Sequence, residues 1–291
     1  MALTQHFDFL HVIAGMLVGV LVGLTGVGGG SLMTPLLVLL FGVNPQTAVG
    51  TDLLFAAMTK IAGSAVHGKR ETVDWRIVRR MACGSVPAAI LTLATLSWFG
   101  KVGNSTERLI MVSLAVLLGV TALAVICRKW LLRLAHDIDP IQPRSRVLTG
   151  TVLLGAAIGV AVSISSVGAG AIGMTVLLVL YPKLPVARIV GSDIAHAVPL
   201  ALIAGFGHWM IGDVDFPLLG VLLIGSIPGV VIGSYLSSHA SDRILQPLLA
   251  CVLAVSSWQL FLKANAGEKP HAVPVTAPAV TIAGEAAAKQ P

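Results

Sequence analysis

Long apolar stretches separated by short polar segments make up most of this chain, and they fall into two groups of five. Those of the first half lie near residues 9–25, 31–42, 47–66, 77–99 and 109–127. Those of the second half lie near 147–166, 170–181, 189–211, 217–236 and 244–262. Because the stretches are continuously apolar rather than alternating, they predict membrane helices and not the strands of a β-barrel.

The two halves repeat each other in sequence. At an offset of 140 the identical pairs begin with Gly15 and Gly155; the others are Gly19 with Gly159, Gly28 with Gly168, Gly30 with Gly170, and Pro45 with Pro185. One residue is then inserted, and at an offset of 141 Gly50, Asp52, His67, Val73, Asp74, Gly84, Ser85 and Pro87 match Gly191, Asp193, His208, Val214, Asp215, Gly225, Ser226 and Pro228. Agreement at so many unusual positions predicts a duplicated module.

The second stretch of each copy is too short to cross a bilayer. About 12 residues span ~18 Å as a helix, against a hydrocarbon core of ~30 Å. We therefore expect the first two stretches of each copy to form a broken or re-entrant hairpin with a glycine break at its tip, followed by three spanning helices. An odd number of crossings per copy would insert the two copies in opposite orientations, as inverted-topology repeats.

The distribution of basic residues agrees with an inverted arrangement. The loop 67–80 carries five Lys and Arg residues, whereas its repeat partner 208–217 carries none. Because basic loops stay in the cytoplasm, the positive-inside rule places 67–80 and the basic segment 128–146 there, with both termini extracytoplasmic. The expected organisation is a first repeat (1–127), a cytoplasmic linker (128–146), a second repeat (147–263) and a disordered tail (264–291).

Composition narrows the class of protein. The chain is 56% hydrophobic and only 11% charged, whereas soluble domains carry roughly 25% charged residues. The net charge of +6 comes largely from the two basic loops, so it predicts orientation in a lipid bilayer and not nucleic-acid binding. Cys83, Cys127 and Cys251 lie in separate stretches, which indicates neither a disulfide framework nor a metal site.

The glycine clusters are the first candidate site. The runs Gly26-Val27-Gly28-Gly29-Gly30-Ser31 and Val167-Gly168-Ala169-Gly170-Ala171 interrupt apolar stretches. Glycines there would break the helix and expose amide groups at bilayer depth, where helix N-termini favour anions. Two such breaks in equivalent positions predict a binding site between two broken helices.

Polar residues in the third stretch of each copy are the second candidate. Asp52 and Asp193 either cap their helices or line a cavity. Lys60 lies deep in its stretch and needs a partner, for which Asp193 is a better candidate than Asp52. Arg188 lies either at the membrane edge or at the cavity. His196 could relay protons with Asp193 or be structural. The predicted substrate-binding residues are Gly28, Gly29, Gly30, Ser31, Thr51, Asp52, Lys60, Gly168, Gly170, Arg188, Ser192, Asp193 and His196.

Three segments resemble the sulfite exporter TauE/SafE family of membrane transporters. They are the runs Gly23–Ser31, Thr47–Leu54 and Arg188–His196. The similarity extends over nearly the whole chain up to about residue 262. The resemblance implies a transporter that moves sulfur-containing anions, such as sulfite or organosulfonates, across the bacterial inner membrane.

Together these features predict a secondary transporter that exports a small oxyanion, needs no cofactor and uses protons as a candidate coupling ion. The alternative is a divalent-cation transporter that uses Asp52, Asp193, His196 and His208. An enzyme is not expected, because no GxSxG or HExxH pattern accompanies the serines and histidines. Oligomeric state and the exact substrate are not determined by the sequence.

Overall fold

The computed structural model describes residues 9–25, 30–67, 73–99, 104–136, 144–167, 170–236 and 242–266. These residues form ten α-helices. The first half gives α1 (Phe9–Thr25), α2 (Gly30–Leu39), α3 (Pro45–His67), α4 (Trp75–Phe99) and α5 (Asn104–His136). The second half gives α6 (Arg144–Ser165), α7 (Ala171–Leu180), α8 (Val186–Ile211), α9 (Phe216–Leu236) and α10 (Asp242–Ala266). The prediction of an all-α chain with five helical segments per half is confirmed.

Six of the described helices are long and apolar enough to cross a membrane: α4, α5, α6, α8, α9 and α10. The short helices α2 and α7 have 10 residues each, or ~15 Å, and cannot cross alone. Helix α3 is not among the six, and it carries the charged residues Asp52 and Lys60. Large apolar side chains on the spanning helices face outward, as a lipid-facing surface requires; Leu91, Leu123 and Leu153 are each at least 60% exposed.

Two helix bounds differ from the sequence expectation. Helix α5 continues to His136, so the first part of the expected linker 128–146 is helical. Helix α6 has 22 residues, which makes the first arm of the second hairpin long enough to cross. The apolar pattern misses such ends because a helix extends beyond the bilayer on polar residues such as Arg128 and Lys129.

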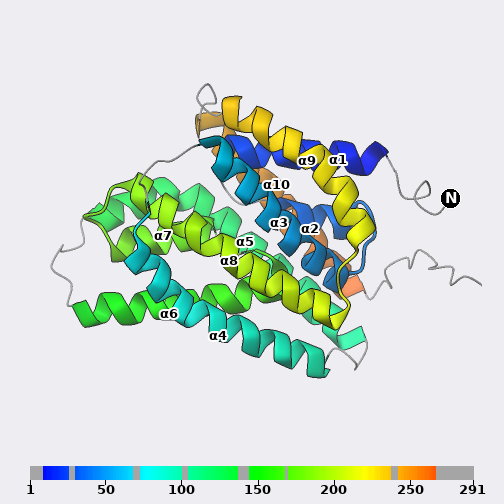
Figure 1. The fold of residues 1–291 in the computed structure, drawn as a ribbon, viewed down its shortest axis with the longest axis horizontal. Coiled ribbons are helices and arrows are strands. Elements are labelled where there is room, and N and C mark those ends of the chain that lie inside the picture. The colour runs from blue at the N-terminus through cyan, green and yellow to red at the C-terminus, as the bar shows by residue number, and fades with distance from the viewer. Residues whose placement is uncertain are drawn as a thin grey trace, which may run out of the picture.

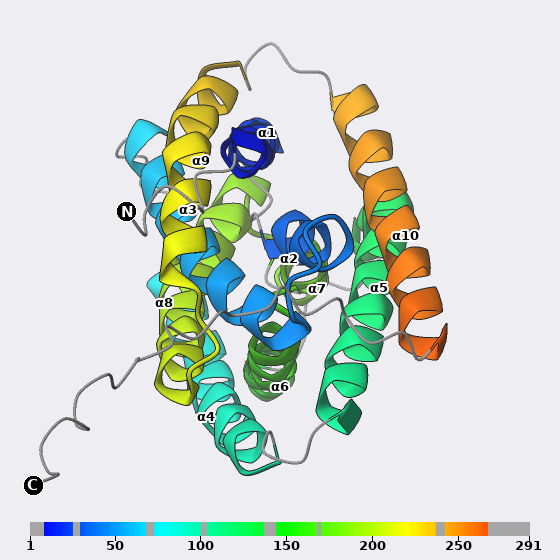
Figure 2. The ribbon, with the colours of Figure 1, turned by 90° about the vertical axis from the view of Figure 1, so that its right-hand side faces the viewer.

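The helices pair across the two halves (Figure 1). Helix α1 lies beside α9, and its repeat equivalent α6 lies beside α4. Helices α5 and α10 form a second kind of pair, and α3 lies beside α8. Figure 2 shows α2 and α7 between the α5–α10 pair and the side of the molecule formed by α8 and α9.

Glycines allow the close approach of these pairs. A Cβ added at Gly19 in α1 would lie 2.8 Å from Ser226 Cα in α9, and one added at Gly159 in α6 would lie 2.8 Å from Ser85 Cα in α4. The contact between Gly15 and Leu222 likewise has its counterpart between Gly155 and Met81. These glycines therefore act as packing residues, since small residues let helix backbones touch.

Hydrogen bonds repeat in the same way. The Asp215 amide donates to Thr51 Oγ1 (3.0 Å), and the Asp74 amide donates to Ser192 Oγ (2.8 Å). These four residues are two pairs of equivalents at the offset of 141. The two halves therefore make matching contacts with each other, both through helix packing and through these loop–helix hydrogen bonds.

Candidate functional site

The carboxylates Asp52 and Asp193, which are equivalent in the repeat, lie inside helices and not at their starts. Asp52 is seven residues after Pro45, where α3 begins, and Asp193 is seven residues after Val186, where α8 begins. The capping interpretation of these two acids is therefore wrong, because seven residues place each acid about two turns inside its helix. A cap near α3 comes from Asn44, whose Oδ1 accepts the Gln46 amide (2.9 Å).

Capping is instead carried out by Asp74 and Asp215. Asp74 Oδ1 accepts the Arg76 amide and Asp215 Oδ1 accepts the Leu218 amide, both at 2.9 Å. These bonds satisfy amide groups at the starts of α4 and α9 that have no partner within their helices.

Asp52 is fully buried and is held by the short helix of its own half. Thr34 in α2 donates its hydroxyl to Asp52 Oδ2. Ser166 lies beside the same carboxyl group, yet neither Ser166 Oγ nor Asp52 Oδ1 has a well-formed hydrogen bond. Ser166 follows the end of α6 and adopts a left-handed backbone conformation (φ 58°), so the chain turns sharply where it leaves that helix.

Asp193 is also buried, but one of its carboxyl oxygens lacks a donor. It packs against Gly173 near the start of α7, where an added Cβ would lie 2.6 Å from Asp193 Oδ1. That oxygen has no hydrogen-bond partner among the described residues. Asp193 thus lies near the N-terminal end of α7, where the helix dipole favours negative charge.

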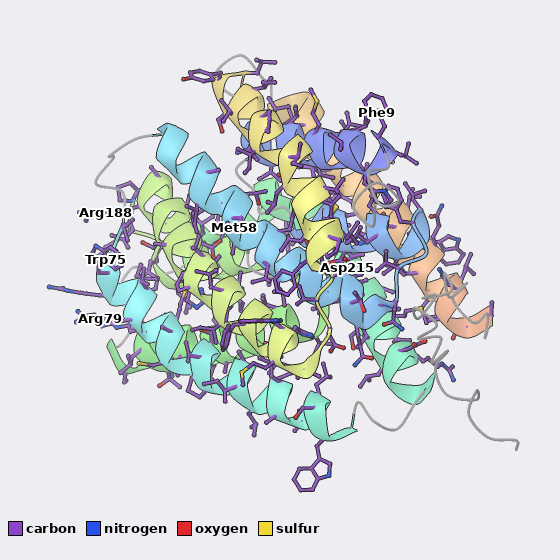
Figure 3. The ribbon with its side chains drawn as sticks, turned by 45° about the vertical axis from the view of Figure 1, so that its right-hand side comes forward. Phe9, Met58, Trp75, Arg79, Arg188 and Asp215 are labelled. Carbon is purple, nitrogen blue, oxygen red and sulfur yellow. The ribbon has the colours of Figure 1, made fainter. Side chains whose placement is uncertain are left out.

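Lys60 is the cation nearest these acids. It is half-buried in α3 and lies within electrostatic range of Asp193 and, more weakly, of Asp52. None of the described residues forms a hydrogen bond or a close ion pair with its ammonium group. Met58, two residues earlier, marks the position along α3 in Figure 3. A partly buried ammonium group that lacks a close hydrogen-bond partner is costly, so a ligand that supplied such bonds would be favourable there.

His196 completes the polar group from the α8 side. Its Nε2 lies 2.7 Å from Ser85 Oγ in α4, its Nδ1 has no partner, and it too lies within electrostatic range of Lys60. Asp52, Lys60, Asp193 and His196 are therefore brought together from two helices, one in each half. Buried polar atoms without partners usually mark an ion, a water or a functional site.

The remaining predicted residues are placed differently. Thr51 and Ser192 use their hydroxyls to bind the loop of the opposite half, as described above. Arg188 is exposed in the first turn of α8, and Figure 3 shows it near Trp75 and Arg79. Ser31 is buried and Gly30 begins α2, while Gly170 precedes α7. Gly28, Gly29 and Gly168 lie outside the described residues.

His208, part of the alternative cation site, is engaged elsewhere. Its Nε2 lies 2.8 Å from the Ser163 carbonyl oxygen of α6, and its Nδ1 lies 3.5 Å from Asp213 Oδ2. Among the residues that the structure describes, no three His, Cys, Asp or Glu side chains are grouped as metal ligands would be.

Sequence reasoning missed Thr34, Gly173, Ser85 and Ser166 as neighbours of the charged residues. Only Ser85 carried a signal, because it matches Ser226 in the repeat. Thr34 aligns with Met174 and Gly173 with Met33, so the repeat comparison alone gives no reason to select them. Their roles follow from tertiary contacts.

The comparisons with known proteins agree along nearly the whole chain. The sequence profile of the sulfite exporter TauE/SafE family matches residues 11–260. The probable membrane transporter protein YjnA of Bacillus subtilis (strain 168) is 39% identical over 250 residues, which cover 86% of this chain and 98% of that protein.

Two more distant relatives carry similar names. The probable membrane transporter protein YdhB of the same bacterium is 25% identical over 252 residues, covering 85% of this chain and 97% of that protein. A probable membrane transporter protein of Methanocaldococcus jannaschii is 25% identical over 275 residues, covering 88% and 97%. No solved structure matches the chain.

Proposed function

Because the chain belongs to the sulfite exporter TauE/SafE family, we propose that this multi-pass membrane transporter exports small sulfur-containing oxyanions, sulfite or an organosulfonate. It acts as a secondary transporter of the bacterial inner membrane, with protons as the coupling ion. The family and the names of its relatives support a role in membrane transport, without naming the substrate of this chain, and argue against an enzyme. The choice of an anion rests on the chemistry of the polar group between α3 and α8.

The observation that carries the proposal is the Lys60 ammonium group. It is a half-buried cation in a helix of an apolar bundle, and none of the described residues bonds to it. An oxyanion at Lys60 would supply charge-assisted hydrogen bonds, which are shorter and stronger than neutral ones. The amide-bearing start of α7 lies near Asp193 and adds positive potential.

The matching contacts between the two halves support inverted-topology repeats. Equivalent helices pair across the halves, and the loop 67–80 is basic whereas its counterpart is not. In this arrangement the glycine breaks of both hairpins meet at mid-membrane, both termini are extracytoplasmic, and the site between α3 and α8 opens to either side in turn.

The test is anion flux in proteoliposomes containing the Lys60→Met variant, which keeps the length of the side chain and removes its charge. A lost charge-assisted hydrogen bond is worth about 1.5–3 kcal/mol, so sulfite affinity and flux should fall about tenfold or more. Lys183→Ala removes an exposed lysine in the loop between α7 and α8 and should leave flux unchanged.

Two controls make the result decisive. Both variants should elute as the wild type does in size-exclusion chromatography, so that lost flux reports on the site and not on folding. Wild-type sulfite flux in folded Lys60→Met would remove the lysine, and with it the proposed anion site, from the mechanism.

A further inference from the structure

The polar group between α3 and α8 contains more acid than base. Among the described residues, one ammonium group, Lys60, faces two carboxyl groups, Asp52 and Asp193. If both acids were ionised, the group would be negative before any ligand arrived. Adding an oxyanion would then place several like charges together in a low-dielectric interior, where repulsion is strong. An anion site built from these residues therefore requires that one of the two acids becomes neutral.

The structure distinguishes the two acids by what surrounds them. Asp52 accepts a hydrogen bond from Thr34 and has Ser166 beside it. Hydrogen bonds donated to a carboxylate favour its ionised form. Asp193 packs against Gly173, and among the described residues its Oδ1 has no hydrogen-bond partner. Lys60 is the one cation in range of Asp193 among the described residues, so Asp193 depends on Lys60 for its counter-charge.

We propose that Asp193 is the proton-binding site of the transporter and takes up one proton from water when an oxyanion binds to Lys60. This inference rests on the proposed function. The anion draws the ammonium away from Asp193 and adds a like charge nearby. Both changes favour the neutral carboxyl group, which gains an O–H bond. Anion and proton then occupy the protein together.

The other groups around Asp193 do not provide an equivalent proton site. On α3 they are Asp52 and Lys60, and on α7 the neighbour is Gly173. On α8 itself His196 lies one turn away, with Nε2 bonded to Ser85 of α4. A protonated His196 would be a second cation within range of Lys60, and the two like charges would repel each other.

The experiment measures protons taken up per bound anion by isothermal titration of the purified protein in buffers of different ionisation enthalpy. Sulfite itself exchanges protons near neutral pH, so the probes are sulfoacetate and thiosulfate, which stay fully ionised there. The wild type should take up about one proton per bound anion, and affinity should rise about tenfold per unit fall in pH.

Three variants locate the proton. Asp193→Asn mimics the neutral acid, so it should bind the anion with no proton uptake and little dependence on pH. Asp52→Asn, at the equivalent position, and His196→Gln should keep the uptake. All three are compared with the wild type in thermal unfolding to confirm that they fold.

The outcomes separate this inference from the proposed function. If none of the anions, sulfite included, binds to the wild type, the proposed function fails. If anions bind without proton uptake, the proposed function stands and the inference fails. The inference also fails if uptake persists in Asp193→Asn or if this variant folds but no longer binds the probe. Uptake lost in His196→Gln alone would assign the proton to the imidazole and overturn the inference.

Discussion

At the scale of residues, equivalent positions in the two halves share a carboxylate but differ in what faces it. His196 has Phe55 as its counterpart, and Lys60 has Ala201. The donor Thr34 has Met174, and Gly173 has Met33. The backbone contacts between the halves match, yet the cation comes from one half and the imidazole from the other. The two halves therefore build one asymmetric polar group and not two copies of a site.

The serine pair Ser85 and Ser226 tests this asymmetry at matched positions. Both are fully buried, but Ser85 bonds to His196. Among the described residues Ser226 Oγ has no partner, and Phe55 stands at the position equivalent to His196. Ser85→Ala should lower the free energy of unfolding by about 1–3 kcal/mol, since it leaves a buried imidazole nitrogen unpaired.

Ser226→Ala removes an unpaired hydroxyl, so it should change stability by less than about 0.5 kcal/mol or raise it. The measurement is denaturant unfolding in detergent, with both variants side by side. Equal losses in the two variants would show that the hydrogen bond to His196 contributes nothing to stability.

At the scale of elements, glycine decides which helices touch. Gly15 and Gly19 bring α1 against the backbone of α9, and Gly155 and Gly159 bring α6 against α4. Lipid tails are as apolar as the helix faces, so close van der Waals packing, and not burial from water, holds these pairs together. Each pair joins one half to the other.

We predict that Gly19→Ala and Gly159→Ala destabilise the protein by similar amounts. An added Cβ would overlap the backbone of Ser226 or Ser85, which cannot move aside as a flexible side chain can. Overpacking of this kind costs about 1–3 kcal/mol. Thermal unfolding in detergent should show the loss in both variants.

Gly220→Ala is the matched control within α9. Nothing lies within 4 Å of a Cβ added there, and alanine favours a helix by up to about 1 kcal/mol over glycine. Its melting temperature should stay equal or rise. A loss as large as that of Gly19→Ala would mean that the packing contact is not the cause.

At the scale of the whole molecule, the two halves interlock. The first helix of each half packs on the fourth helix of the other, and Thr51 and Ser192 each bind the loop that precedes that fourth helix. The halves are therefore not separate bodies that touch at one flat surface. Under the proposed function, a motion that opens the site must keep these contacts. We therefore expect α1 to move together with α9, and α6 together with α4.

Inverted topology makes a labelling prediction at Trp75 and Phe216, which are equivalent and exposed. In a variant without Cys83, Cys127 and Cys251, single cysteines are introduced as Trp75→Cys and Phe216→Cys. A membrane-impermeant maleimide added to intact cells should label position 216 and spare position 75. Permeabilised cells provide the control, in which both positions should react. Labelling of both, or of neither, in intact cells would refute the inverted arrangement.

Much of the fold could be predicted because its signals are local. Apolar stretches of membrane length, the offset of 140 to 141 and the basic loops all lie within the linear sequence, and the ten helices occur where these signals place them. Helix ends were less predictable. Helices α3 and α8 begin at Pro45 and Val186, two and three residues before the apolar stretches, because hydropathy reports burial and not hydrogen bonding.

The amino-acid sequence alone determined that the chain is a bundle of membrane helices built from two related halves. Bilayer thickness and the need to satisfy backbone hydrogen bonds leave few other folds for such a sequence. Only the tertiary structure decided that Asp52 and Asp193 lie within helices and not at caps, that Thr34 holds one acid and Gly173 faces the other, and that Arg188 is exposed. These facts depend on which helix faces which, and such distances between remote segments are set by packing across the whole bundle.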